Sequence, residues 1–437
     1  MKTNEKDTKQ GVVPFLRFPE FSDVQEWKEI PMHQIGKTLT GLSGKNSSDF
    51  GCGKRYITYK QVYSDTVNDF DKCEKVFVNE SEKQNCVQQG DVLFTTSSET
   101  PDEVGISSVI LKPLPETIYL NSFCFILRPY DINNLYPQFA KYLFQSPTYR
   151  KRINKLAQGA IRFNLSKAQF ISLSLPIPIG LNEQQKIADC LSSIDALIKA
   201  AENKIDELKA HKKGLMQQLF PAEGKMVPAL RFPEFQNAGE WTKGPLSRIG
   251  DVLQGYGFPE KYQGKSLGKY PFYKVSDISK AFQTGCNFIS KAVNYIDDEE
   301  LDILKIKTTP PGTTIFARIG EAIRLNRRIV TTQECIIDNN TVGVKAIPEN
   351  AIDLFVYYIL LQVDLIDFAG GVVPAVTKSA IENIPIYCPP TKSEQKKIVD
   401  CLSSVDNLII AQTNRLEALR NHKKGLMQQL FPNIDEC

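Results

Sequence analysis

Two long stretches of this chain place apolar residues at alternating steps of three and four positions. They cover residues 181–221 and 392–432. A period of 3.5 is typical of a helix that pairs with another helix along a narrow seam. Roughly 37 helical residues at 1.5 Å each give a rod of about 55 Å. The predicted seam residues are Ile187, Leu191, Ile194, Ile198, Ile205, Leu208, Leu215, Leu219, Ile398, Leu402, Val405, Ile409, Leu416, Leu419, Leu426 and Leu430.

The two stretches are copies of each other. Residues 183–221 and 394–432 are identical at 26 of 39 positions, with an offset of 211. A shorter repeat opens each half of the chain, as VPFLRFPEF at 13–21 and VPALRFPEF at 227–235. The segments between these markers have diverged almost beyond alignment. The chain is therefore an internal repeat of two variable bodies on two nearly constant helices.

Each helix needs a partner for its seam, and the other copy is the nearest candidate. A parallel pair would carry both bodies on one side, whereas an antiparallel pair would relate them by a pseudo-twofold axis. We expect an antiparallel coiled coil, because the Phe-Pro end of the first helix leads directly into the second LRFPEF. Phe431 and Pro432 would then return near the first LRFPEF. Lys212, Gln412 and Lys423 interrupt the apolar seam.

Several residues predicted to point away from the seam are identical in the two copies. A recent duplication would explain this identity, but the intervening bodies have diverged heavily. We therefore expect each helix to present one surface to one copy of the same partner, which implies two partner subunits. The identical residues are Lys186, Asp189, Ser193, Asp195, Lys213, Gln217 and Gln218, matched by Lys397, Asp400, Ser404, Asp406, Lys424, Gln428 and Gln429.

The variable bodies, residues 13–180 and 227–391, mix short strand-like runs with one helical stretch each. Strand-like runs are expected at 54–63, 75–80, 91–96, 123–130, 270–278, 312–320 and 341–347. The helical stretches lie near 136–157 and 350–366. This mixture predicts two similar α+β domains whose loops are free to vary.

Composition indicates a globular protein. Apolar residues make up 42% of the chain and charged residues 24%, and 437 residues exceed one ordinary core. The polar residues 1–12 do not resemble a signal peptide, and no apolar run approaches membrane-spanning length. We expect a cytoplasmic protein with no membrane partner. Ten cysteines without a CxxC pair and only three histidines favour reduced thiols and no metal site.

The distribution of charge is more informative than the net charge of +3. No acidic residue occurs between Asp131 and Glu183, and a second basic cluster spans 318–328. Such runs are often only solvated faces, but one in each body favours double-stranded DNA as a partner.

Candidate DNA contacts are polar or cationic residues beside aromatic ones in these bodies. Arg and Asn can reach base edges, whereas Lys and Ser mostly hold phosphates. For any single candidate, an ordinary structural role is an equal alternative. The candidates are Lys54, Arg55, Tyr56, Tyr59, Thr95, Thr96, Ser97, Arg150, Lys151, Arg152, Arg162, Asn164 and Lys167 in the first body, and Lys274, Arg318, Arg324, Arg327, Arg328 and Lys378 in the second.

Motifs for catalysis are not recognisable in the sequence. Residues 257–266 end in Gly-Lys-Ser but carry Pro259 where a phosphate-binding loop needs glycine. Pro101-Asp102-Glu103 is not followed by the Glu-x-Lys of a nuclease. We therefore predict no catalytic residue and no bound cofactor in this chain.

The combination of EQxKIxxxLSSxDxLI, KKGLMQQLFP and LRFPEF resembles the specificity (S) subunits of Type I restriction–modification systems. The resemblance runs from about residue 13 to 432 and recurs in register. It implies that 13–180 and 227–391 are target recognition domains, and that 181–221 and 392–432 are conserved spacer helices. It also implies an asymmetric, bipartite DNA target with a gap set by the helices.

The resemblance further implies partners that supply the chemistry. Two methyltransferase (M) subunits would bring S-adenosylmethionine, and restriction (R) subunits would join through the complex with ATP and Mg²⁺. A fused methyltransferase–nuclease could replace separate M and R subunits. Two other classes stay open at this point: a self-sufficient DNA methyltransferase or nuclease, and a coiled-coil scaffold that binds only protein.

Overall fold

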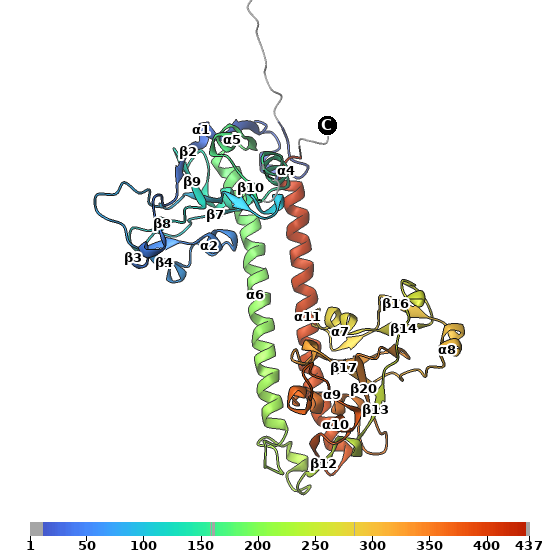
Figure 1. Ribbon diagram of the computed structural model, residues 1–437. Helices are drawn as coiled ribbons and strands as arrows, with labels where there is room; N and C mark the ends of the chain where they lie inside the picture. The colour runs from blue at the N-terminus through green and yellow to red at the C-terminus, as the bar shows by residue number, and fades with distance from the viewer. Residues whose placement is uncertain (1–11, 158, 160–161, 284, 434–437) are drawn as a thin grey trace, which may run out of the picture. The chain divides into compact units, whose positions relative to one another are not determined.

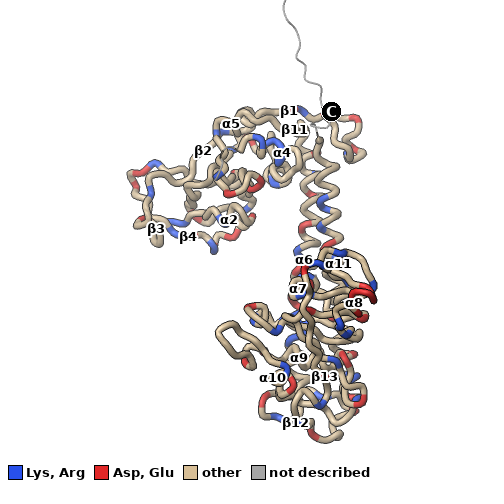
Figure 2. Tube along the Cα trace, turned by 45° about the vertical axis from the view of Figure 1, so that its right-hand side comes forward, with Lys and Arg blue, Asp and Glu red and all other residues tan. Residues whose placement is uncertain are grey.

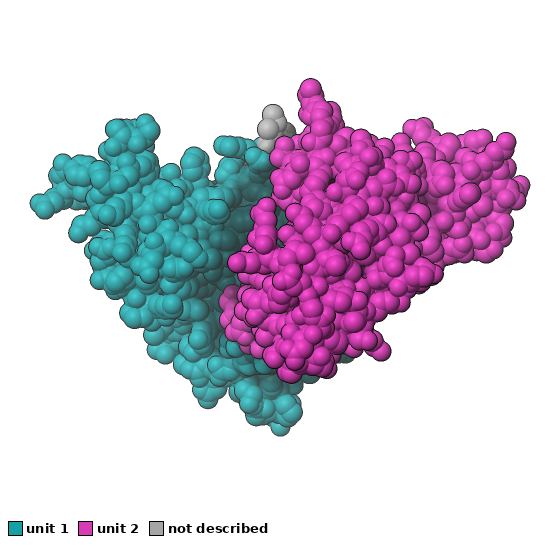
Figure 3. All heavy atoms as spheres, turned by 90° about the horizontal axis from the view of Figure 1, so that it is seen from below, with its two compact units in different colours: residues 1–198, 418–437 teal, residues 199–417 magenta. Residues whose placement is uncertain are grey.

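The computed structural model describes residues 12–157, 159, 162–283 and 285–433. The polar N-terminal residues 1–11 and Cys437 lie outside the described residues. Two compact units make up the chain, unit 1 with residues 1–198 and 418–437, and unit 2 with residues 199–417 (Figure 3). Each unit contains one α+β domain and a segment of both long helices. These helices are α6 (Leu181–Leu219) and α11 (Lys392–Leu430) (Figure 1).

Unit 1 is built on an antiparallel sheet with strand order β2-β9-β5-β7 and a smaller sheet with order β4-β3-β8. Strands β1 and β11, and β6 and β10, form two further pairs. The strands are β1 (Lys28–Pro31), β2 (Gly36–Thr40), β3 (Phe50–Ile57), β4 (Glu74–Val76), β5 (Val92–Thr95), β6 (Ser97–Ser98), β7 (Ser107–Val109), β8 (Tyr119–Leu120), β9 (Cys124–Pro129), β10 (Phe163–Asn164) and β11 (Ser174–Ile177). The short helices are α1 (Met32–Ile35), α2 (Tyr59–Tyr63), α3 (Pro137–Leu143), α4 (Pro147–Leu156) and α5 (Lys167–Ser172), with 3-10 turns η1 (Pro19–Phe21), η2 (Ser47–Asp49), η3 (Phe70–Lys72) and η4 (Pro101–Glu103).

Unit 2 repeats this plan with a sheet of order β13-β20-β17-β18-β15, a sheet of order β16-β14-β19 and the pair β12-β21. The strands are β12 (Thr242–Pro245), β13 (Gly250–Gln254), β14 (Tyr270–Tyr273), β15 (Phe288–Ile289), β16 (Asn294–Ile296), β17 (Thr314–Ala317), β18 (Arg328–Thr331), β19 (Ile336–Ile337), β20 (Thr341–Ala346) and β21 (Pro385–Cys388). The short helices are α7 (Val275–Gln283), α8 (Asp298–Leu304), α9 (Asp353–Leu361) and α10 (Lys378–Glu382), with 3-10 turns η5 (Pro233–Phe235), η6 (Leu246–Arg248), η7 (Glu260–Tyr262), η8 (Glu321–Ile323) and η9 (Leu365–Phe368).

The two α+β domains share one topology, to which unit 2 adds β15 as a parallel edge strand. In both, the first long strand of the main sheet pairs antiparallel with the strand that precedes a helix, as β2 with β9 and β13 with β20. In both smaller sheets the central strand also has a parallel neighbour, as β3 with β8 and β14 with β19. This confirms the predicted pair of similar α+β domains.

Several expected elements differ from prediction: the run at 75–80 is a strand only to Val76, and the run at 270–278 is a strand only to Tyr273, before α7 begins at Val275. Two further differences have a cause in helix capping. The run at 54–63 is a strand only to Ile57, because Thr58 and Gln61 form a capping box that starts α2. The helix expected at 136–157 is broken into α3 and α4, because the side chain of Ser146 caps a new helix that begins at Pro147. At both places, hydrogen bonds from capping side chains determine where a helix begins, and the apolar pattern does not.

Within each unit the segments of α6 and α11 run antiparallel. In unit 1, Ile187 and Leu191 near the start of α6 share a core with Leu430 near the end of α11. In unit 2, Leu219 near the end of α6 shares a core with Ile398 and Leu402 near the start of α11. The predicted seam residues are all buried or half-buried.

The repeated LRFPEF motif holds the start of each long helix. The Arg17 guanidinium donates two hydrogen bonds of 2.8 Å to Glu183, and Trp27 Nε1 donates to the same carboxylate at 2.9 Å. The side chains of Arg231, Trp241 and Glu394 repeat this arrangement in unit 2. All six side chains are nearly excluded from solvent.

The same motif also contacts the Phe-Pro end of a long helix. In unit 1 the Leu16 amide donates to the Gln429 carbonyl at 3.0 Å, and the Phe431 ring packs edge-on against Trp27. In unit 2 the Leu230 amide donates to the Gln218 carbonyl at 2.9 Å, and Phe220 packs against Trp241. This confirms that Phe431 and Pro432 return to the first LRFPEF.

Candidate nucleic-acid interface

A backbone strap of the same form lies on the main sheet of both units. In unit 1 the Leu165 amide donates to the Thr96 carbonyl at 2.8 Å, and Ser97 pairs with Asn164 in the β6-β10 ladder. In unit 2 the Val376 amide donates to the Arg318 carbonyl at 2.9 Å, and Ile319 forms a bridge to Ala375. The offset of 211 relates Asn164 to Ala375. The unit 2 strap covers residues 370–376, and the described residues 162–165 of the unit 1 strap are equivalent to its residues 373–376.

The unit 1 strap borders a cleft of about 420 Å³. The cleft brings together three of the predicted residues, Tyr59, Ser97 and Arg162, and Asn164 pairs with Ser97 at its edge. The Tyr59 hydroxyl donates to the Ser97 carbonyl at 2.8 Å, and its ring stacks on Tyr63. The cleft is lined by Tyr59, Lys60, Tyr63, Ser97, Ser98, Glu99, Glu103, Phe123 and Arg162.

One carboxylate of this cleft, Glu103, has a lowered pKa. Hydrogen bonds from the Tyr63 hydroxyl and the Ser98 hydroxyl, each 2.8 Å, hold the pKa of Glu103 below its ordinary value. The cleft therefore offers both cationic donors and anionic acceptors. Base edges carry both kinds of complementary group, so this mixture suits contact with bases better than contact with phosphates alone.

The cations predicted in unit 2 lie on several elements. Arg318 donates from Nε to the Asn339 carbonyl at 3.0 Å, and Arg324 pairs with Glu321 at 3.1 Å on an exposed turn. Arg327 lies over the Phe282 ring, with 5.7 Å from Cζ to the ring centroid. The other two, Lys274 and Lys378, contact Gln263 and Glu382 respectively.

Three predicted contacts are wrong, because the fold buries their side chains. Arg328 is fully buried and donates to Asn326 and to the Val363 carbonyl. Burial lowers the pKa of Arg328 to about 10, so the guanidinium stays charged at neutral pH. Tyr56 is buried with its hydroxyl on Glu74, and Thr95 is buried against the Glu103 carbonyl.

The acid-free run in unit 1 is not a one-sign surface. The Arg152 guanidinium binds Glu29 through two hydrogen bonds of 2.9 and 3.0 Å. Arg150 donates to the carbonyls of Val104, Gly105 and Asp102, and burial lowers its pKa. Both arginines therefore hold the domain together. Figure 2 shows acidic residues interspersed with basic ones over both domains.

The remaining candidates of unit 1 are not brought into the cleft. Lys54 and Lys151 are exposed and Lys167 is half-buried. Arg55 pairs with Glu116 at 3.2 Å. Thr96 donates its hydroxyl to the Phe123 carbonyl at 2.7 Å, beside the cleft.

Sequence reasoning missed several lining residues of the cleft. Lys60 and Tyr63 follow Tyr59 on the short helix α2, which the sequence pattern presented as a strand. Phe123 is largely exposed at the rim, and an apolar residue at a strand start gives no signal of exposure. In unit 2 the strap carries the exposed residues Val372 and Val373, which a search for polar side chains passes over.

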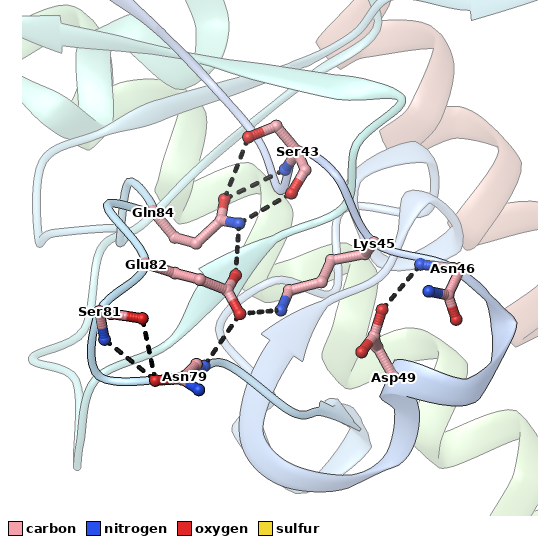
Figure 4. Close-up of polar contacts among 8 residues, drawn as sticks. All are labelled: Ser43, Lys45, Asn46, Asp49, Asn79, Ser81, Glu82 and Gln84. Atoms are coloured by element: carbon pink, nitrogen blue, oxygen red, sulfur yellow. Dashed lines mark hydrogen bonds and ion pairs between the residues drawn. The ribbon is translucent and has the colours of Figure 1, made fainter.

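A second polar cluster fixes two loops of unit 1 near β3. Glu82 accepts hydrogen bonds from Lys45 at 2.6 Å, from the Asn79 amide and from Gln84, and Gln84 also bonds the backbone of Ser43 (Figure 4). These bonds lower the pKa of Glu82 to about 2, with those from Gln84 and Lys45 as the main causes. The cluster clips residues 43–49 to residues 79–84.

Metal sites and membrane spans are the other kinds of feature considered for the described residues. No group of three or more His, Cys, Asp or Glu side chains there could hold a metal ion. No helix in that part of the chain is long and apolar enough to cross a membrane.

Comparison with known proteins places this arrangement in a family. A family model described as the Type I restriction modification DNA specificity domain matches residues 24–210 and again 239–421. A specificity subunit described for the type I restriction enzyme MjaX of Methanocaldococcus jannaschii is 26% identical, over 98% of this chain and 96% of that protein. The EcoKI specificity subunit of Escherichia coli is 27% identical over 48% of this chain and 46% of its own length.

Solved structures agree on the fold. The S subunit of a Type I restriction–modification system from M. genitalium superposes with a TM-score of 0.56 at 14% identity, over 96% of this chain and 99% of that one. A chain from a study of assembly of the type I R-M system superposes with a TM-score of 0.55 at 16% identity, over 93% and 98%. The chain belongs to the family of the Type I restriction modification DNA specificity domain and carries that domain twice.

Proposed function

We propose that this chain is the non-catalytic DNA-reading subunit of a Type I restriction–modification complex. Each α+β domain reads one half of an asymmetric, bipartite target, and the two long helices set the gap between the halves. One observation carries this proposal. Two domains of the same topology differ at their exposed straps, although the helices that hold them are nearly identical.

In this function the strap and cleft of unit 1 contact bases. Arg162 and Asn164 are both exposed at the strap, and their side chains can each make paired hydrogen bonds to a base edge. Exposed lysines such as Lys60 hold phosphates, which positions the domain without selecting a sequence. In unit 2 the half-buried Arg318 lies beside the strap and is the corresponding arginine.

The experiment is to map methylated adenines in DNA treated with the reconstituted complex. We expect a bipartite, asymmetric target whose two halves are separated by a gap of fixed length. Exchanging residues 227–391 for the equivalent domain of a relative should replace one half of the target and leave the other unchanged. A continuous or symmetric target, or a change in both halves, would contradict this function.

The long helices provide the surface for two methyltransferase subunits. Asp189, Ser193, Leu197 and Ala200 are exposed and follow one another on one face of α6. The same four residue types are exposed at the equivalent positions of α11. We call these two faces the docking stripes, made of Asp189, Ser193, Leu197 and Ala200, and of Asp400, Ser404, Leu408 and Ala411.

Some positions next to the docking stripes differ between the two helices, whereas the stripe positions themselves are identical. Ala196 and Lys199 flank Leu197 but have become Asn407 and Ile410 in the second copy. Leu197 and Leu408 are about half exposed. Exposure to water does not stabilise an apolar side chain, so a leucine on a polar helix face suggests a contact with a partner. A recent duplication would leave neighbouring positions identical as well. Identity at the stripes beside changed neighbours therefore favours two copies of the same partner, one on each helix.

A stoichiometry measurement tests the docking stripes. Leu197→Lys or Leu408→Lys alone should give complexes with one methyltransferase subunit, and the double variant should bind none. Size-exclusion chromatography with light scattering measures these masses. Leu267→Lys, at a largely exposed leucine outside the stripes, is the matched control and should keep two subunits. Two bound subunits in the double variant would contradict this docking site.

The chemistry of the complex belongs to the partners in this proposal. The methyltransferase subunits bind S-adenosylmethionine, and restriction subunits that join through the complex use ATP and Mg²⁺. This chain contributes no cofactor site. Isothermal titration of the purified chain with S-adenosylmethionine or ATP should give no heat of binding, and measurable binding would contradict the assignment.

A further inference from the structure

The unit 2 strap ends in a narrow hairpin with an apolar tip. Gly370 and Ala375 exchange two backbone hydrogen bonds of 3.0 and 3.1 Å, so residues 371–374 form a four-residue loop. Gly371 has a φ of +90°, a conformation that other residues rarely adopt. Val372 and Val373 form the tip of this loop, and Val372 is completely exposed.

The base of this hairpin is fixed to the main sheet. The Gly320 amide donates to the Pro374 carbonyl at 2.7 Å, and the Val376 amide donates to the Arg318 carbonyl at 2.9 Å. Valine also has few rotamers, so neither backbone nor side chains lose much freedom when the tip makes a contact. Two valines held rigidly in water are suited to bind an apolar surface.

The charged residues next to the hairpin indicate which kind of apolar surface its tip binds. The segment that anchors the hairpin carries exposed or half-buried Arg318, Arg324 and Arg327, against the single acid Glu321. An apolar tip among cations suits a polyanion with apolar groups between its charges. The major groove of duplex DNA has this character, because thymine C5-methyl groups lie between two rows of phosphates.

The equivalent strap of unit 1 has a different character. With the offset of 211, Arg162 stands where unit 2 has Val373, and Asn164 stands where unit 2 has Ala375. Lys167 and Lys378 keep the same residue type two positions beyond the strap. The straps therefore differ where they would meet bases and agree where they would meet phosphates.

We propose that Val372 and Val373 read thymine by apolar contact with its C5-methyl group, in the half-site assigned to unit 2. This inference rests on the proposed function and names the feature of DNA that this strap selects. Arg324 then holds a flanking phosphate. Unit 1 reads its own half-site with hydrogen-bonding groups of Arg162 and Asn164 instead.

Deoxyuridine tests the inference, because it differs from thymidine only by the lost methyl group. The complex is assembled with its methyltransferase subunits, and the half-site of unit 2 is assigned by domain exchange. Thymines are then replaced by uracil one at a time. For the unaltered complex we expect about 10-fold slower methylation at one or more positions of this half-site. Equivalent replacements in the other half-site should have little effect.

A variant of the tip completes the test. Val372→Ser with Val373→Ser should slow methylation of the thymine duplex about 10-fold and should remove the sensitivity to uracil. Ile303→Ser, at an exposed apolar residue of α8, is the matched control and should change neither property.

The outcomes separate this inference from the proposed function. Uracil sensitivity that persists in the double variant, a half-site without A·T pairs, or a variant that no longer assembles with its partners would overturn the role of the tip. A complex that methylates no defined sequence would overturn the proposed function itself.

Discussion

Lys212 of α6 forms an ion pair with Asp406 of α11, with 2.6 Å between Nζ and Oδ1. The Tyr358 hydroxyl donates to the other oxygen of Asp406 at 2.7 Å. In unit 1 Lys423 and Asp195 pair at the same distance, and Tyr142 donates to Asp195 at 2.8 Å. The two lysines that interrupt the predicted seam therefore each meet a carboxylate of the other helix that also accepts from a tyrosine of the adjacent domain.

This arrangement corrects the expectation for Asp195 and Asp406. Both were predicted to face an external partner because they are identical in the two copies. Asp406 is instead 5% exposed, and Asp195 is half-buried. Identity at these two positions is explained by contacts inside the chain. The other identical residues predicted to face a partner are exposed in both helices.

Replacement of Lys212 by methionine should destabilise unit 2. It leaves the Asp406 carboxylate buried with a single neutral donor, and loss of one member of a buried pair costs about 3 kcal/mol. Urea unfolding followed by Trp241 fluorescence in a Trp27→Phe background measures this change.

Lys423→Met is the matched control, because the Lys423 and Asp195 side chains are more exposed than their counterparts. It should cost about 1 kcal/mol, measured by Trp27 fluorescence in a Trp241→Phe background. Equal losses for the two variants would show that burial does not set the strength of these pairs.

Arg17→Met should destabilise the attachment of the first domain to α6. The variant leaves Glu183 buried with only the Trp27 indole as a hydrogen-bond donor, so the unfolding free energy of unit 1 should fall by about 3 kcal/mol. Lys186→Met removes the exposed pair with Glu20 and should change it by less than about 1 kcal/mol. The prediction fails if the two variants unfold at the same urea concentration.

The helices and the domain repeat could be predicted because their signals are local. The seam needs only spacing along one helix, and the paired LRFPEF motifs need only comparison within the chain. The family resemblance stated from these motifs is confirmed by the family match to both halves.

The site could be predicted only in part because exposure depends on contacts between distant segments. Arg327 and Arg328 are adjacent cations in the sequence, yet Arg327 is half-buried over the Phe282 ring whereas Arg328 is fully buried beside Val363. Arg152 belongs to an acid-free run, yet its partner Glu29 lies 123 residues earlier. The sequence gives no indication that Val372 and Val373 are exposed, because valines are expected in the hydrophobic core.

Low pH should weaken the contact that Glu82 makes between the loops at residues 43–49 and 79–84. Its pKa is lowered from the ordinary value of 4.5 to about 2, so the ionised form favours the closed loops. The stabilisation is complete above about pH 4.5 and is lost as the pH falls towards 2. Hydrogen exchange of residues 79–84, corrected for intrinsic rates, should therefore speed up below pH 4.5. Glu82→Gln should show fast exchange at neutral pH and no such transition, and a transition that survives in this variant would contradict the assignment.

Arg162→Ala and Arg318→Ala should damage different halves of the target. Arg162 lies in the unit 1 cleft and Arg318 at the unit 2 strap, so each variant should relax selection at one half-site. Loss of a paired contact to a base costs about 1–3 kcal/mol, which is about 10-fold or more in the methylation rate at that position. Sequencing of methylated DNA measures both halves at once. An equal loss at both halves for either variant would identify that arginine as a general phosphate contact.

The length of the helix pair should set the gap between the half-sites. A heptad inserted after Asn203 in α6 and another after Asn414 in α11 keep the seam in phase, because these positions are equivalent in the two copies. Each insertion lengthens its helix by about 10 Å, which is about three base pairs at 3.4 Å per step. The mapped target should keep both half-sites and gain about three base pairs between them.

A heptad in α6 alone puts the two helices out of register, so it should reduce folding and methylation together. An unchanged gap with both heptads present would mean that the partner subunits, rather than these helices, hold the two domains apart.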